Sequence, residues 1–170
     1  LVLLAVSSRH GPHWDELYFA QLPLRWWYED QPPLTVWLTW LMRQASEALW
    51  VQRLPAIAAA AAGAYVAALF PRALGASAPV QSLAAWAHAF TVYPLIMGHV
   101  FTTSILDLLA WQLVILCVLR ANLAGQGSWL GWAGLIAGLA CWNKLLIVAL
   151  VIALATSLLL GTPVTWCRVS

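Results

Sequence analysis

The chain has 170 residues, of which 63% are hydrophobic and only 8% are charged, and its mean hydropathy is +0.82. Soluble globular domains carry roughly 25% charged residues, so this composition excludes an ordinary water-soluble fold and predicts an all-α polytopic membrane protein. The formal net charge of +2 is small and dispersed along the chain, which argues against nucleic acid as a partner.

The N-terminal part predicts a loop at a membrane surface. Residues 1–8 are too short to cross a bilayer and lack an initiator Met, so we expect the end of a first transmembrane helix in a fragment of a longer protein. Residues 9–49 are predicted to form a long external loop with two interfacial helices. One covers about residues 14–27, and the other begins at Pro33, a residue type favoured in the first turn of a helix. Six of the twelve tryptophans lie between residues 14 and 50, as expected at a membrane interface.

The remainder of the chain predicts membrane-spanning helices. Four stretches contain no Asp, Glu, Lys or Arg, at residues 54–71, 73–106, 121–143 and 145–167. A helix needs about 20 mainly apolar residues to cross a bilayer. We therefore predict five spans, at residues 50–71, 79–100, 103–121, 128–142 and 144–161. The fourth span carries small residues that would let helices approach closely: Gly131, Ala133, Gly134, Ala137 and Gly138.

The alternation of these spans gathers charged residues on one side of the membrane. That side is predicted to hold Asp15, Glu16, Asp30, Arg53, Asp107 and Lys144. The other side receives Arg72, Arg120 and Arg168 and no acidic residue. Because cytoplasmic loops are enriched in Lys and Arg, we predict a multi-pass protein of the plasma membrane whose acidic side faces outside the cytoplasm.

Several of these charged residues are candidates for a functional site. Asp107 and Lys144 lie within apolar sequence, where an ionisable side chain is costly and usually functional. The alternative for both is a helix-end residue that extends to the interface. For Asp15 and Glu16 the alternative is the first turn of a solvated helix, and for Arg53 an interface anchor. The histidines and cysteines show no metal-ligand spacing, whereas the carboxylates could bind a divalent cation.

Carboxylates and cations at a bilayer surface suit the transfer of a sugar from a lipid phosphate. A carboxylate can accept the proton of a hydroxyl as its oxygen attacks the sugar. Arg or Lys can neutralise the leaving phosphate. Since phosphate is already a weak base, no general acid is needed, in contrast to glycoside hydrolysis.

Short motifs spread along the chain resemble the N-terminal part of GT-C glycosyltransferases. They are Asp15-Glu16-Leu17-Tyr18, Asp30-Gln31-Pro32-Pro33-Leu34, Arg53-Leu54-Pro55, Asp107 and Asn143-Lys144. Their order and spacing are similar to those of the protein mannosyltransferase and aminoarabinose transferase group across nearly the whole chain. The resemblance implies a GT-C-like transmembrane helix bundle with a long first external loop.

The same resemblance implies an inverting transferase that moves a sugar from a polyprenyl-phosphate-linked donor to a glycan, lipid or protein acceptor. The implied catalytic residues are Asp15, as the base, with Glu16 and Asp107. The residues implied for substrate or donor-phosphate binding are Arg53, Lys144, Asp30 and Tyr18. Gln31 stands where several relatives carry a basic residue before the paired prolines.

Two other functions remain open from the sequence. An ion-coupled transporter could use Asp107 and Lys144 as an intramembrane relay. The long external loop favours the transferase, because a relay needs no such loop, and no inverted repeat is visible. An inactive truncated remnant would keep the helix packing without the activity, since the later helices of the family are absent from the sequence.

Overall fold

The computed structural model describes residues 2–7, 9 and 11–160, and every regular element in those ranges is an α-helix. The helices are α1 (Val2–Val6), α2 (Trp14–Gln21), α3 (Leu34–Ala45), α4 (Leu49–Gln52), α5 (Leu54–Ala73), α6 (Ala78–Ala89), α7 (Val92–His99), α8 (Thr103–Ala124), α9 (Ser128–Cys141) and α10 (Ile147–Leu160). The predicted all-α class is therefore confirmed. His10, Cys167, Arg168 and the ends of the predicted segments at residues 1, 8 and 161 lie outside the described ranges.

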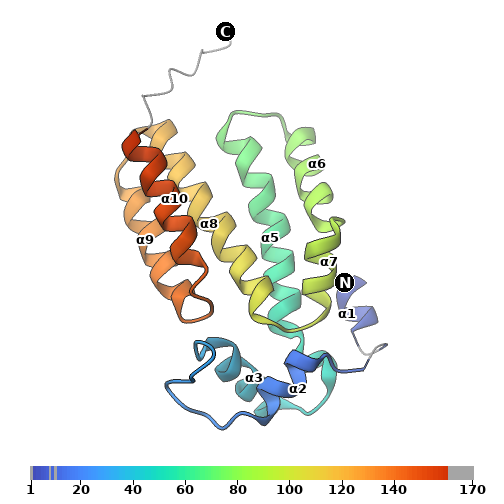
Figure 1. Ribbon diagram of the computed structural model, residues 1–170. Helices are drawn as coiled ribbons and strands as arrows, with labels where there is room; N and C mark the ends of the chain where they lie inside the picture. Colours follow the sequence, from blue (N-terminus) through green and yellow to red (C-terminus); the bar gives the residue numbers. More distant parts are fainter. Residues whose placement is uncertain (1, 8, 10, 161–170) are drawn as a thin grey trace.

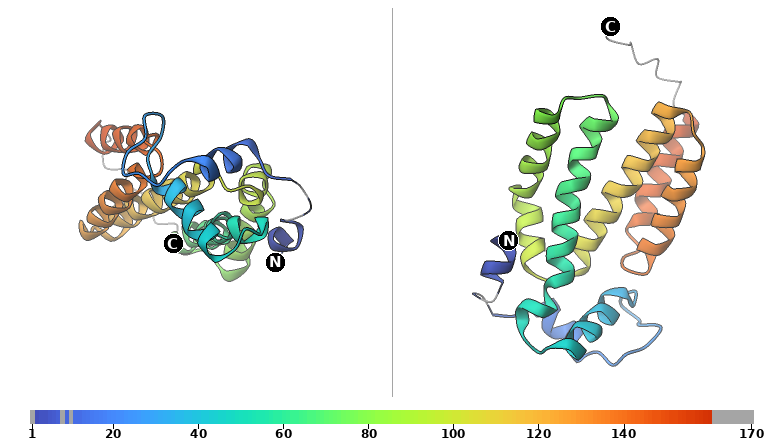
Figure 2. Two further views of the ribbon diagram at one scale, coloured as in Figure 1. Left: turned by 90° about the horizontal axis from the view of Figure 1, so that it is seen from below. Right: turned by 180° about the vertical axis from the view of Figure 1, so that it is seen from behind.

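The helices form a bundle with a layer of short helices across one end. Helices α5 to α10 run roughly side by side, and α2 and α3 lie below them (Figure 1). Seen from behind, α8 lies between the α5–α6 pair and the α9–α10 pair (Figure 2). Helices α5 and α8 are long and apolar enough to cross a membrane, and α9 and α10 are shorter apolar helices of 14 residues each. The arrangement is that of a helical membrane bundle.

Prolines divide two segments that the sequence predicts as continuous helices. The segment at residues 79–100 consists of α6 and α7, which are separated at Phe90 and Thr91. Pro94 lacks an N–H group, and its ring would clash with the carbonyl of residue 90 in an unbroken helix. Likewise α2 ends at Gln21 instead of continuing to residue 27, because Leu22 precedes Pro23 and adopts an extended conformation with ψ 131°.

Small residues of α9 form the contact with α8, although not all those predicted. Ala133, Ala137 and Ala140 are buried against Val114 and Cys117 of α8, in a cluster that also includes two residues of α10. The glycines of α9, by contrast, lie on its open side: a Cβ atom placed on Gly131, Gly134 or Gly138 would have no neighbour within 4 Å. The close approach predicted for this helix therefore involves its alanines.

A glycine is required where α7 crosses α5 and α1. A Cβ atom on Gly98 would lie 2.8 Å from the Cβ of Ala60 and 2.9 Å from Cδ1 of Leu3. We expect Gly98→Ala to lower the free energy of unfolding by roughly 1–3 kcal/mol, since the backbones must separate. Thermal unfolding in detergent measures the change. Gly131→Ala is the matched control, because it fills open space, and an equal loss in both variants would contradict the prediction.

The layer of short helices has a small core of its own. Phe19 of α2, Tyr28 of the loop after it and Val36 of α3 are buried together. The Tyr28 hydroxyl donates to the Pro23 carbonyl at 2.7 Å and accepts from the Arg25 amide at 2.9 Å, which folds the loop back on itself. This layer lies across the end of the bundle when viewed from below (Figure 2).

Candidate active site

The candidate residues of the sequence analysis lie at one end of the bundle. Helix α2, the loop after it, the connection from α7 to α8 and the turn from α9 to α10 are all at the lower end in Figure 1. The residues there are Asp15, Glu16, Tyr18, Asp30, Arg53, Asp107 and Lys144. Arg72 and Arg120 lie at the far ends of α5 and α8. One end of the bundle therefore carries both acidic and basic side chains. Among the described residues, the charged side chains at the other end are all basic.

Glu16 and Arg53 form a buried ion pair at the centre of this end. Arg53 is 0% exposed and Glu16 6%. Arg53 Nε donates to Glu16 Oε1 and Nη2 donates to Oε2, each at 2.8 Å, which is a two-point contact of guanidinium with carboxylate. The same guanidinium donates to the carbonyls of Ser7 and, at 3.0 Å, Gly11. The donors of Arg53 are thus directed to acceptors of the protein itself.

Glu16 connects two further segments through its carboxylate. Oε2 accepts from the His13 amide at 2.8 Å, as part of a capping box at the start of α2. Oε1 accepts from the Phe101 amide at 2.9 Å, in the connection between α7 and α8. Burial acts to raise the pKa of Glu16, but the hydrogen bonds from Arg53, His13 and Phe101 outweigh it and leave the pKa below its ordinary value. Glu16 is therefore ionised at neutral pH and already fully occupied as an acceptor.

Asp15 differs from Glu16 in both its exposure and its hydrogen bonding. It lies in the first turn of α2 and is exposed. Its amide donates to Nδ1 of His13 at 3.3 Å, and no described residue forms a hydrogen bond or ion pair with its carboxylate. Because Glu16 anchors the same turn to the bundle, the free carboxylate of Asp15 is held at the surface of this end.

Asp107 and Lys144 approach each other from helix α8 and from the turn between α9 and α10. Asp107 lies near the start of α8, is 7% exposed, and its Oδ1 has no hydrogen-bond partner among the described residues. It lines a cavity of about 210 Å³ with Tyr93, Ser104 and Trp111. Lys144, in the turn between α9 and α10, is half-buried and close enough to interact electrostatically with Asp107. A buried carboxylate and a cation thus lie near each other beside a cavity, although no ion pair within 4 Å joins them.

Asn143 positions Lys144, a role that the sequence analysis did not assign to it. Asn143 is 2% exposed; its Oδ1 accepts from Thr35 Oγ1 at 2.7 Å and its Nδ2 donates to the Thr103 carbonyl at 2.8 Å. The Leu34 amide donates to the Trp142 carbonyl at 2.9 Å. These bonds attach the α9–α10 turn to α3 and α8. The sequence indicates this role only through the position of a polar amide between a long apolar run and Lys144. The hydrogen-bond partners of Asn143 are distant in sequence and could not be predicted.

Tyr18 and Asp30 connect α2 to the loop that follows it. The Tyr18 hydroxyl donates to the carboxylate of Asp30, and this bond raises the pKa of Tyr18. Both side chains are exposed. Among the described residues, no group of three or more His, Cys, Asp or Glu side chains is placed to hold a metal ion.

Comparison with known proteins identifies one family. The family model described as dolichyl-phosphate-mannose-protein mannosyltransferase matches residues 30–170. Arg53, Asp107 and Lys144 lie within the matched range, and Asp15, Glu16 and Tyr18 precede it. No curated protein and no solved structure matches the chain.

Proposed function

Because the chain belongs to the dolichyl-phosphate-mannose-protein mannosyltransferase family, a family of GT-C membrane glycosyltransferases, we propose that it transfers a sugar from a polyprenyl-phosphate donor to an acceptor hydroxyl with inversion. One structural observation supports this reaction: a free carboxylate, Asp15, lies at the same end of the bundle as the Asp107–Lys144 pair. A base for the acceptor and a cation for the leaving phosphate are the two groups that the reaction needs.

The proposed step is a single displacement at the anomeric carbon. The acceptor oxygen attacks that carbon from the face opposite the phosphate, forming the new glycosidic bond. The bond between the anomeric carbon and the phosphate oxygen breaks, and its electron pair leaves with the polyprenyl phosphate. The acceptor proton passes to the carboxylate of Asp15, which later releases it to water.

The remaining candidate residues take different parts in this proposal. Lys144 neutralises the leaving phosphate, and Asp107 holds the ammonium group of Lys144 in place. Tyr18 and Asp30 contact substrate hydroxyls at the surface of the loop. Glu16 and Arg53 position the turn that carries Asp15, since their polar atoms are occupied by each other and by the backbone.

The proposed location is the plasma membrane, which the chain crosses several times. Arg72 and Arg120 lie at the end opposite the candidate site, and arginine is enriched on the cytoplasmic side. The site then faces outside the cytoplasm. Cysteine labelling at position 30 from either side of intact cells tests this orientation; labelling from the cytoplasm alone would overturn it.

Transfer can be tested directly in membranes that contain the full-length gene product. Radiolabelled polyprenyl-phosphate sugars are supplied, and label is followed into lipid, glycan and protein fractions. We expect transfer from at least one donor. If well-folded protein transfers no sugar from any donor, the proposal fails, and substrate flux across the membrane would then indicate a transporter.

Lys144→Ala is expected to raise the donor KM by about 10- to 100-fold, because a charge-assisted hydrogen bond to phosphate contributes roughly 1.5–3 kcal/mol. Steady-state kinetics with varied donor concentration measures the change. Arg72→Ala, at the opposite end of the bundle and exposed, is the matched control. An unchanged donor KM in the Lys144 variant would show that Lys144 does not bind the donor and only anchors the turn at the membrane interface.

A further inference from the structure

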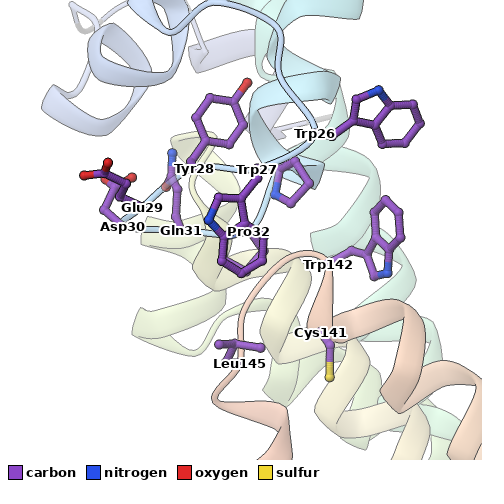
Figure 3. A pocket seen from close by; sticks show the side chains of 11 residues that line it. Trp26, Trp27, Tyr28, Glu29, Asp30, Gln31, Pro32, Cys141, Trp142 and Leu145 are labelled. Atoms are coloured by element: carbon purple, nitrogen blue, oxygen red, sulfur yellow. The ribbon is translucent and has the colours of Figure 1, made fainter.

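A cleft lined by tryptophans lies beside the α9–α10 turn, and of its lining residues only Asp30 has a part in the reaction described above. Its volume is about 410 Å³, within the usual range for small-molecule sites. The loop between α2 and α3 forms one side, and the end of α9 with the following turn forms the other (Figure 3). We call it the tryptophan cleft; its lining includes Trp26, Trp27, Trp142, Glu29, Asp30 and Gln31.

The aromatic side of the tryptophan cleft is a fixed surface. Trp37, behind the cleft, makes edge-on contacts with Trp26 at 4.8 Å and with Trp142 at 5.4 Å between ring centroids. Its indole N–H donates to the Arg25 carbonyl at 2.8 Å, which attaches the loop to α3. Trp26 and Trp27 are nevertheless 77% and 78% exposed. Indoles that are held by their neighbours, as those of Trp26 and Trp142 are, give contact area at little cost in conformational entropy.

The other end of the cleft is polar. Figure 3 shows Glu29 and Asp30 at the end opposite Trp26 and Trp142. Both carboxylates are exposed, and Gln31 adds an amide whose Nε2 is buried without a hydrogen-bond partner among the described residues. The cleft therefore offers hydrogen-bond acceptors and an unused donor on one side and an apolar wall on the other.

The carboxylates and indoles of the cleft favour one substrate of a glycosyltransferase over the other. Two carboxylates repel the phosphate of a lipid-linked donor, so the anionic donor is a poor occupant. A sugar ring, in contrast, has an apolar C–H face that can lie on an indole and hydroxyls at its edge that donate to carboxylates. Tryptophans that only anchor a protein in the interface would need no carboxylates beside them.

We propose that the tryptophan cleft binds a sugar ring of a carbohydrate acceptor, on which the transferred sugar is placed. The proposal rests on the proposed transferase function and names the class of its acceptor. Trp142 and Leu145 line the cleft and flank Lys144 in the sequence, so a glycan held there lies beside the turn that carries the cation assigned to the donor phosphate.

Binding of glycans without transfer tests this proposal. The full-length protein in lipid nanodiscs is applied to an array of immobilised neutral and acidic oligosaccharides, and apparent Kd values are measured for those retained. We expect at least one oligosaccharide to be retained. Its apparent Kd should rise about tenfold or more in Trp26→Ala and in Glu29→Gln, because both side chains line the cleft. Trp50→Ala and Glu47→Gln are the matched controls: both are exposed at the same end of the bundle and outside the cleft.

Three results would overturn the proposal. The first is that no oligosaccharide is retained, and the second is that the Trp26 and Glu29 variants retain oligosaccharides as well as the wild type does. The third is displacement of the bound glycan by polyprenyl phosphate, which would assign the cleft to the donor. Because the readout is binding alone, glycan retention can succeed where sugar transfer fails, and the two proposals are separable.

Discussion

Asp15→Asn should abolish sugar transfer while leaving the protein folded. Removal of a general base typically lowers the rate by about 10²- to 10⁴-fold, and asparagine has nearly the same size as aspartate but cannot accept the acceptor proton at neutral pH. Asp15 is exposed, and its carboxylate has no partner among the described residues, so the free energy of unfolding should change little. Turnover in reconstituted membranes and thermal unfolding in detergent measure the two effects separately.

The comparison with other carboxylates makes this experiment specific. Glu47→Gln removes an exposed carboxylate at the same end of the bundle and should leave turnover near the wild-type value. Donor KM should also stay unchanged in Asp15→Asn, because the base acts on the acceptor. If the variant retains near-normal turnover, Asp15 has no part in the chemistry, and Asp107 becomes the remaining candidate for the base.

Much of the fold follows from patterns that are local in sequence. Apolar run lengths predict the bundle, and the alternation of its helices brings Asp107 and Lys144 to the same end as the N-terminal loop. The breaks that the prediction missed are also local. Pro94 prevents an unbroken helix through residue 90, and Pro23 excludes helical geometry at Leu22. The family resemblance is confirmed by the match over residues 30–170, which contains every motif except the one at residues 15–18.

The pairing of side chains across the fold could not be predicted in this way. Glu16 and Arg53 are 37 residues apart, and Thr35 and Asn143 are 108 apart. Helical periodicity places each of these residues on a helix face or in a turn but does not specify its partner. The family resemblance implies that Arg53 binds the donor phosphate, whereas in the structure its guanidinium donates to Glu16 and to the carbonyls of Ser7 and Gly11.

The Glu16–Arg53 pair gives the second large expected effect. Arg53→Met should lower the free energy of unfolding by about 3–5 kcal/mol, because it leaves the Glu16 carboxylate buried without its counter-charge. Turnover should fall together with stability, since the turn that carries Asp15 loses the two hydrogen bonds from Arg53 to Glu16. Arg25→Met is the matched control, because Arg25 is exposed at the same end and its side chain forms no hydrogen bond or ion pair with the described residues.

Kinetics separate this positioning role from direct contact with phosphate. If Arg53 positions Asp15, the folded fraction of Arg53→Met should show a lower kcat with an unchanged donor KM, and Glu16→Gln should reproduce that pattern. If Arg53 contacts the phosphate, donor KM should rise as in Lys144→Ala, and Glu16→Gln should leave it unaffected. A rise in donor KM confined to the Arg53 variant would therefore contradict the positioning role.

The acid dependence of stability gives an independent measure of the same pair. The pKa of Glu16 is lower in the folded protein than in the unfolded chain, so its contribution is complete above the unfolded pKa and is lost as pH falls through the folded value. Wild-type protein should consequently lose stability as pH falls from the ordinary pKa of glutamate to the lower pKa of Glu16 in the folded protein. Glu16→Gln, already less stable at neutral pH, should lose less over the same range. Thermal unfolding of both proteins from neutral to acid pH measures the difference. Parallel curves would show that the pair contributes nothing to folding through the charge of Glu16.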